Sequence, residues 1–291
     1  MKQSLRETIW KGLFFGAALA SVLAVALICV FLFAGGLPAI FKVGPLEFLL
    51  GQKWAPGNIP PSFGILPMIV GSVFVTLGAA LTGVPIGILT AAFMARFCPR
   101  RIYSPLKAAV ELLAGIPSVV YGFFGLVVLV PLVRECGWFP ENDGMNILTA
   151  SLLLGMMILP TVIGVSEAAI RAVPEAYYEG SLALGATHEQ SVFRVLLPAA
   201  RSGITAAVVL GVGRAIGETM AVVMVAGNQP RLPKTIFKGA RTMTANIVME
   251  MGYAADLHRE ALIATGVVLF LFILLINLCS SRLKRREAND R

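Results

Sequence analysis

The chain has 291 residues, of which 57% are hydrophobic and 14% charged, and its formal net charge is +8. A soluble domain has about 45–50% apolar and about 25% charged residues, so this composition predicts an integral membrane protein. The positive charge does not indicate nucleic-acid binding. Lys and Arg lie beside apolar segments, where they set orientation and meet anionic lipid headgroups, and no basic patch is interleaved with aromatic residues.

Six apolar stretches are long enough to cross a bilayer, which takes about 20 residues. The first follows a basic start, but its apolar run exceeds the roughly 7–15 residues of a signal peptide, so we expect a retained helix. The sequence therefore predicts an all-α integral membrane protein with six transmembrane helices. We place them near residues 12–34, 66–94, 108–133, 147–168, 202–226 and 261–280.

The distribution of Lys and Arg predicts the orientation of the chain. Segments 1–11, 95–107, 169–201 and 281–291 together hold nearly twice as many of these residues as segments 35–65, 134–146 and 227–260. By the positive-inside rule the first group faces the cytoplasm. We therefore expect a cytoplasmic N-terminus (1–11), a periplasmic loop (35–65), a core over 66–280 and a basic cytoplasmic tail (281–291).

The predicted periplasmic loop 227–260 does not follow this rule, because it carries five basic residues. Two interpretations remain open. Earlier segments can override a late loop, or the loop can form a basic external surface that attracts an anion or an acidic partner. The five residues are Arg231, Lys234, Lys238, Arg241 and Arg259.

Proline interrupts two of the predicted spans, at Gly83-Val84-Pro85 and at Gly115-Ile116-Pro117. Proline removes a backbone hydrogen bond and kinks a helix. Backbone groups freed at membrane depth have to be buried in protein or face water. Together with a charge inside the fifth span, these breaks favour a translocation path, although a kink also serves packing alone.

The predicted cytoplasmic loop 171–198 has the pattern of two short helices joined at a glycine. Pro174 suits the first turn of a helix and Gly185 its end. Thr187 and Gln190 have the spacing of a capping box that opens the second helix. Leu197-Pro198 ends the second helix in this interpretation.

Within this loop, Glu179 to Pro198 resembles the EAA loop of binding-protein-dependent ABC importer permeases. Glu179, Gly185 and Leu197-Pro198 fall at the family's spacing, whereas Gly180-Ser181 replaces Ala-Ala. The resemblance implies that the loop docks in a groove of a separate ATPase. It implies that Glu179, Gly185, Ala186, Leu197 and Pro198 contribute to this coupling.

The chain lacks the GxxxxGK[ST] phosphate loop, so we expect it to hydrolyse no ATP itself and to bind no cofactor. The partner ATPase would bind ATP and Mg²⁺. This expectation agrees with the resemblance, since the family's ATPase is a separate chain.

Three further stretches resemble permeases of phosphate importers. They are 113–122, 54–56 followed by 63–69, and 213–220 ending at 226–228. The last of these resembles the PstC type rather than its partner PstA. The resemblance implies the type I ABC importer (MetI-like) fold in the bacterial inner membrane. The implied partners are a PstA-like permease, two copies of a PstB-like ATP-binding subunit, a PstS-like periplasmic phosphate-binding protein and membrane lipids, with no nucleic acid.

Arg214 and Glu218 are charges inside the fifth span, where each costs about 2.5–3.5 kcal/mol on insertion-based scales. They are four residues apart, so we expect them to share one face of a helix and partly neutralise each other. They are either a structural pair, or Arg214 binds hydrogen phosphate and Glu218 holds it when the path is empty. Ser118, Tyr121 and Thr219 are further candidates, as path hydroxyls or as interhelical hydrogen bonds.

Two alternatives to phosphate import remain. An ABC importer for another oxyanion, such as sulfate or molybdate, would share most of these features. An ion-coupled secondary transporter could use Arg214 and Glu218 as a relay, but it would not need a loop that docks an ATPase. A membrane enzyme is disfavoured because no cluster of catalytic residues faces either side.

Overall fold

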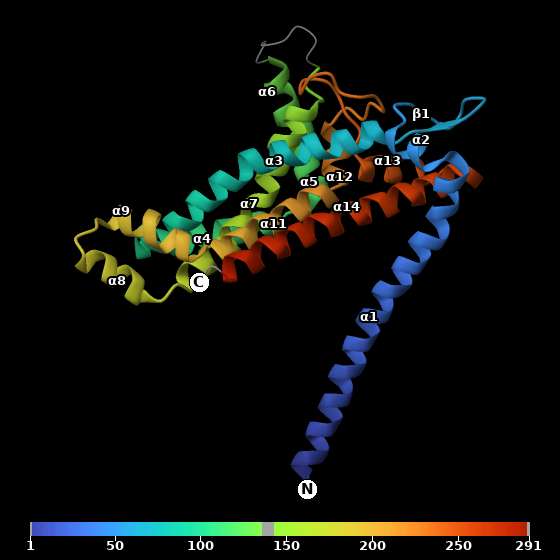
Figure 1. Cartoon of the computed structure of the whole chain (residues 1–291). Coiled ribbons are helices and arrows are strands. Elements are labelled where there is room, and N and C mark those ends of the chain that lie inside the picture. Colours follow the sequence, from blue (N-terminus) through green and yellow to red (C-terminus); the bar gives the residue numbers. More distant parts are fainter. Residues whose placement is uncertain (1, 136–142, 290–291) are drawn as a thin grey trace.

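The computed structural model describes residues 2–135 and 143–289, and these are mostly helical (Figure 1). The first half of the chain comprises α1 (Lys2–Val43), α2 (Pro45–Leu50), β1 (Trp54–Ala55), β2 (Ser62–Phe63), α3 (Leu66–Ala92), the π-helical turn η1 (Phe93–Phe97), α4 (Arg100–Gly115), α5 (Ser118–Phe124), the π-helical turn η2 (Gly125–Leu129) and α6 (Val130–Glu135). The second half comprises α7 (Ile147–Arg171), α8 (Glu175–Ala183), α9 (His188–Ser191), the π-helical turn η3 (Val192–Leu196), α10 (Leu197–Ala199), α11 (Arg201–Gly217), α12 (Met220–Val225), α13 (Met243–Glu250) and α14 (Asp256–Asn289).

Helices α3, α7 and α11 form the centre of the bundle. Glycines on α3 allow close approach to α7: a Cβ at Gly78 would clash with Ser151, and one at Gly83 with the backbone of Gly155. Small residues take this role in membrane proteins because lipid supplies no hydrophobic drive for helices to associate. Leu153 of α7 is fully buried in the resulting core.

Helix α1 leaves the bundle over most of its length (Figure 1). It contacts α14 near its C-terminal end, where Gly36 lies against Ala264 and Val267. Towards the N-terminus its large apolar side chains are exposed, including Phe15 and Leu27. A face of this kind needs lipid or another apolar subunit to cover it.

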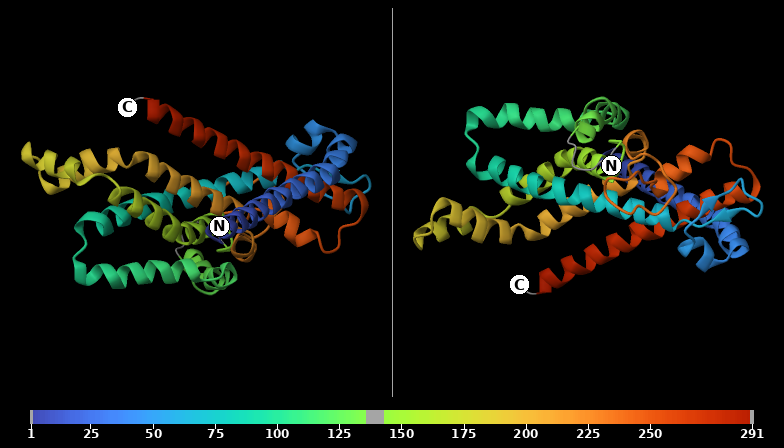
Figure 2. Two further views of the ribbon diagram at one scale, coloured as in Figure 1. Left: turned by 90° about the horizontal axis from the view of Figure 1, so that it is seen from below. Right: turned by 90° about the horizontal axis from the view of Figure 1, so that it is seen from above.

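The bundle has two distinct ends, which we name by the elements they carry. At the β1–β2 end a two-stranded antiparallel ribbon pairs Trp54 with Phe63. At the α8–α9 end the two short helices form a hairpin that projects beyond α3 and α7 (Figure 1). From the end of α3, α4 turns back along the bundle, as two further views show (Figure 2).

Among the described residues, five helices are long and apolar enough to cross a membrane, and a bent pair raises this number to six. The five are Ile9–Val43, Leu66–Phe97, Ser118–Glu135, Ile147–Arg171 and Asp256–Cys279; the pair is His188–Ala199 with Arg201–Gly217, bent by 71°. The chain is thus an all-α, multi-pass membrane protein.

Two of the predicted spans differ from the structure, each because of an interruption. The span predicted at 108–133 is divided at Ile116-Pro117, since Ile116 is extended (ψ 126°), as a residue before proline tends to be. The span predicted at 202–226 ends at Gly217, after which Glu218 is extended (ψ 134°) and α12 begins.

Candidate functional site

The charged pair predicted in the fifth span lies at the break between α11 and α12. The prediction that Arg214 and Glu218 share a face of one helix is wrong, because the helix ends at Gly217. The Glu218 carboxylate instead accepts hydrogen bonds from the backbone N–H groups of Thr219 (3.1 Å) and Ala221 (3.3 Å). Glu218 therefore binds the N-terminal amides of α12, where a negative charge is favoured.

Arg214 is left without a partner in the part of the chain that the structure describes. Its side chain is exposed on the last turn of α11, and it makes no hydrogen bond or ion pair with any group that the structure describes. A guanidinium in this state offers all its donors to a bound anion or to water. Thr219, half-buried at the same break, donates its hydroxyl to the carbonyl of Gly217 (3.2 Å).

A second break, between α4 and α5, lies close to the first. Pro117 has no N–H and cannot bond the Leu113 carbonyl as a helical residue would. The Tyr121 hydroxyl donates to that carbonyl instead (2.8 Å), which bridges the break. Tyr121 is buried, so this bond favours the structural interpretation of its hydroxyl over a place on the path. Ser118 is half-buried at the first position of α5.

Close packing of α5 on α12 brings the two breaks together. A Cβ at Gly122 would meet Ala221 and Met224, and one at Gly125 would meet Val225, so the two helices run in the same direction. Their N-terminal ends therefore lie at the same level. The charge of Arg214 is within electrostatic range of Tyr121, across from one break to the other.

The hairpin at the α8–α9 end has the local structure that its sequence predicts. Gly185 has φ +86°, which favours glycine, and Thr187 and Gln190 form the reciprocal capping box. Gly185 N–H bonds the Leu182 carbonyl and Ala186 N–H bonds the Ser181 carbonyl, which is a Schellman motif. These two predicted coupling residues, Gly185 and Ala186, thus close α8.

The end of the second hairpin helix differs from the prediction. Leu197-Pro198 does not end the helix, because α10 carries the chain on to Ala199, and the bend into α11 comes at Ala200. Pro198 is exposed there and lines a groove of about 780 Å³ beneath the hairpin. Tyr177 and Arg194 line the same groove.

The hairpin carries several exposed apolar side chains. Leu184 at its tip is 92% exposed, and Tyr177, Leu182 and Phe193 are also exposed, as is the predicted coupling residue Glu179. Exposed apolar side chains of this kind mark a surface that contacts another protein or the membrane.

Polar and aromatic contacts fasten the hairpin to η1, at the end of α3. Arg96 donates to both carboxylate oxygens of Glu175 (3.0 and 2.9 Å) and lies 5.5 Å from the centre of the Tyr178 ring. Phe97 packs edge-on against His188, with ring centres 4.5 Å apart. These contacts therefore join the hairpin directly to the segment that follows α3.

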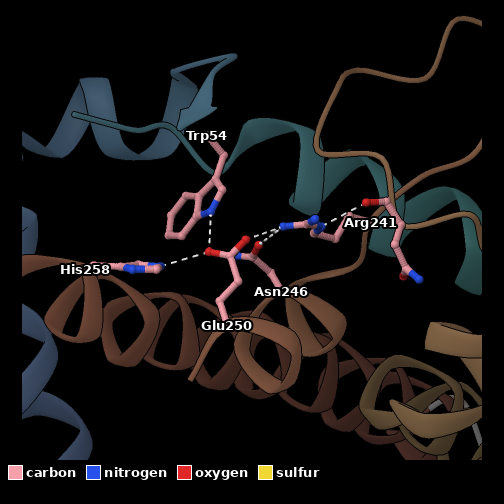
Figure 3. Close-up of polar contacts among 6 residues, drawn as sticks. Trp54, Arg241, Asn246, Glu250 and His258 are labelled. Carbon is pink, nitrogen blue, oxygen red and sulfur yellow. Dashed lines mark hydrogen bonds and ion pairs between the residues drawn. The ribbon is translucent and has the colours of Figure 1, made fainter. Parts of the chain in front are cut away.

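A buried carboxylate organises the opposite end of the molecule (Figure 3). Glu250 accepts hydrogen bonds from Trp54 Nε1 (2.9 Å) and Arg241 Nη1 (2.5 Å), and its Oε2 lies 2.8 Å from His258 Nε2. The Arg241 Nη1 also donates to the Asn246 side chain (3.0 Å). The Arg241 side chain is only 12% exposed, so it does not belong to the predicted basic surface of loop 227–260.

Comparison with known proteins places this arrangement in a family. Residues 83–288 match the family of binding-protein-dependent transport system inner membrane components. The chain belongs to this family.

Several relatives of the chain are named as permeases, and some of these names include a substrate. A probable ABC transporter permease, YqgH of Bacillus subtilis, is 42% identical over 92% of this chain and 88% of that protein. The phosphate transport system permease PstC of Mesorhizobium japonicum is 35% identical over 94% and 88%, and that of Haemophilus influenzae is 32% identical over 96% and 93%.

Solved structures of the same fold have lower sequence identity. A chain from the structure of a bacterial alginate ABC transporter matches over 95% of this chain and 97% of its own length, with 18% identity and a TM-score of 0.62. A chain of the inward-facing MetNI methionine ABC transporter covers 77% and 95%, with 21% identity and a TM-score of 0.61. The permease therefore has the fold of type I ABC importers.

Sequence reasoning missed one further cluster in this permease, around Glu167 of α7. The Glu167 carboxylate is 2% exposed and is bound by Lys107 (2.9 Å), Arg171 (2.8 Å) and the Tyr103 hydroxyl (2.7 Å). The bond to Glu167 raises the pKa of Lys107. A single acidic residue near the end of an apolar span was the available signal, since a buried charge is almost always paired.

Proposed function

We propose that this permease carries inorganic phosphate through an ATP-driven importer of the bacterial inner membrane. The observation that carries the proposal is Arg214, a membrane-embedded guanidinium at the α11–α12 break with no partner among the described residues. Its planar fork matches two oxygens of hydrogen phosphate. Support comes from the relatives named phosphate transport system permeases.

The proposal includes the subunits that the chain would work with. The exposed apolar side chains of the hairpin would dock a separate ATP-binding subunit, which would hold ATP and Mg²⁺. The residues at or near this contact would be Glu179, Gly185, Ala186, Leu197 and Pro198. The uncovered apolar length of α1 supports pairing with a second permease. The permease itself would bind no cofactor.

The proposed orientation puts both termini and the hairpin in the cytoplasm and the β1–β2 end outside. Arg231, Lys234 and Arg259 are exposed at that end and would attract an acidic face of an external phosphate-binding protein. Such a contact weakens with salt, because exposed charges are screened over about 8 Å at physiological ionic strength.

Phosphate uptake by the assembled importer tests this proposal. Arg214→Gln should abolish uptake while the complex still assembles, since removing a charge from a span lowers the cost of insertion. Arg214→Lys should retain a small part of uptake, because Lys keeps the charge but not the bidentate geometry. Arg101→Gln, at an exposed arginine outside the breaks, is the matched control and should transport normally.

Two results would contradict the proposal. Normal uptake by Arg214→Gln at matched protein levels would show that the guanidinium is not a substrate contact. Uptake of sulfate or molybdate in preference to phosphate by the unmodified importer would show that the oxyanion is different.

A further inference from the structure

Helix α12 is a short piece of helix whose two ends are both held by the segment that leads into and forms α13. At its N-terminal end the Thr244 hydroxyl donates to the carbonyl of Glu218 (3.0 Å). Beyond its C-terminal end Ala240 N–H donates to the Ala226 carbonyl (2.8 Å), and Arg241 Nε to the Asn228 carbonyl (3.0 Å). With only six residues, α12 has few hydrogen bonds of its own, so these contacts add to its packing against α5 and α7 in holding it in place.

The α13 segment is itself fixed by Glu250. This carboxylate, at the last position of α13, connects the segment to β1 through Trp54 and to α14 through His258. It also receives Arg241, whose Nε holds the carbonyl beyond α12 (Figure 3). One buried acidic group thus links three separate parts of the β1–β2 end.

From these contacts we propose that Glu250 is a positioning residue that keeps α12 seated against α5. The position of α12 matters because this helix begins at the break that carries Glu218 and Thr219. It packs on α5, whose first residue lies at the second break. Only one consequence rests on the proposed function, namely that the position of α12 affects how the substrate reaches Arg214. The seating of α12 is a property of the chain itself.

The alkylation rate of an introduced cysteine reports how often α12 leaves its packed position, and this measurement needs no transport assay. Val222 of α12 is 1% exposed and Val162 of α7 is 0% exposed, so a cysteine at either position reacts only when its helix opens. Each is introduced singly into a chain whose four native cysteines are replaced by serine. Alkylation rates are then followed in membranes that carry the assembled importer, with and without Glu250→Gln.

Glu250→Gln should raise the alkylation rate of Val222→Cys about tenfold, the ratio expected when one charge-assisted hydrogen bond is lost, and leave Val162→Cys unchanged. Glu260→Gln is the matched control. Glu260 pairs with Lys42 at 2.7 Å near the same end but is partly exposed, so neither rate should change. Unchanged alkylation at Val222→Cys, or an equal rise at both positions, would overturn the proposal.

A second variant keeps the test decisive if Glu250→Gln does not accumulate. Thr244→Val removes only the hydroxyl that binds the Glu218 carbonyl and should raise alkylation at Val222→Cys about threefold. An unchanged alkylation rate at Val222→Cys in that variant would also refute the proposal that these contacts hold α12 in place. Arg214→Gln separates the two proposals, because it should abolish uptake and leave both alkylation rates as they are.

Discussion

Replacing Gly185 by alanine should loosen the hairpin, although the space for the new methyl group is open. A Cβ at this position meets nothing within 4 Å, so steric overlap contributes no cost. The cost comes from the backbone, because φ is +86° and a residue with a Cβ pays about 1–2 kcal/mol in a left-handed conformation.

Gly180 provides a control within the same hairpin. It lies inside α8, and a Cβ there also meets nothing within 4 Å. Alanine at that position should stabilise α8 by about 0.8–1.0 kcal/mol. The two alanine variants change the same number of atoms at equally open sites, so they should differ by about 2–3 kcal/mol with opposite signs.

Amide hydrogen exchange of the hairpin measures this difference, since local opening sets the exchange rate. The N–H groups that close α8, at Gly185 or its replacement and at Ala186, should exchange about ten times faster in Gly185→Ala and more slowly in Gly180→Ala. Gly185→Val should loosen the hairpin further and release or uncouple the ATP-binding subunit. Equal exchange in the two alanine variants would refute the argument from φ.

Three further outcomes are expected. Glu218→Ala should destabilise α12 by about 1 kcal/mol and Glu218→Gln by less, because an amide oxygen still accepts the two N–H bonds; exchange of the Ala221 amide measures both. Glu167→Gln should lower the free energy of unfolding by about 1–3 kcal/mol, which a lowered thermal unfolding midpoint would show. The lower value is expected because Lys107 and Arg171 are partly exposed and regain contact with water. An impermeant thiol reagent should label Lys234→Cys from outside the cell only. Labelling only from the cytoplasmic side would show that the chain has the opposite orientation in the membrane.

The sequence predicts those parts of this permease that depend on neighbouring residues. The capping box at Thr187 and the reversal at Gly185 involve residues three to five positions apart, and the structure confirms both. The break at Pro117 could also be expected, since proline lacks the N–H that a helix needs.

Contacts between distant segments could not be read in this way. Arg241 stands among the basic residues of an external loop, and nothing near it indicates that its side chain turns inward. Its partner Glu250 is shared with Trp54, which lies 196 positions away in the chain. The break after Gly217 was missed for a related reason, because apolar residues on both sides of Glu218 favour a continuous helix.

Arg214 differs from Tyr121 and Glu218, whose side chains both bond the backbone at the two breaks. Breaking a helix in a membrane exposes backbone groups, and each needs a partner. Tyr121 supplies one to the Leu113 carbonyl, and Glu218 supplies one to the amides of α12. Glu218 accepts these bonds at one oxygen, and no described carboxylate is bonded to Arg214. The insertion cost of about 2.5–3.5 kcal/mol for such a charge is therefore not offset by a protein partner within the described residues, and water, a bound anion or an acidic residue of a partner subunit has to reduce it.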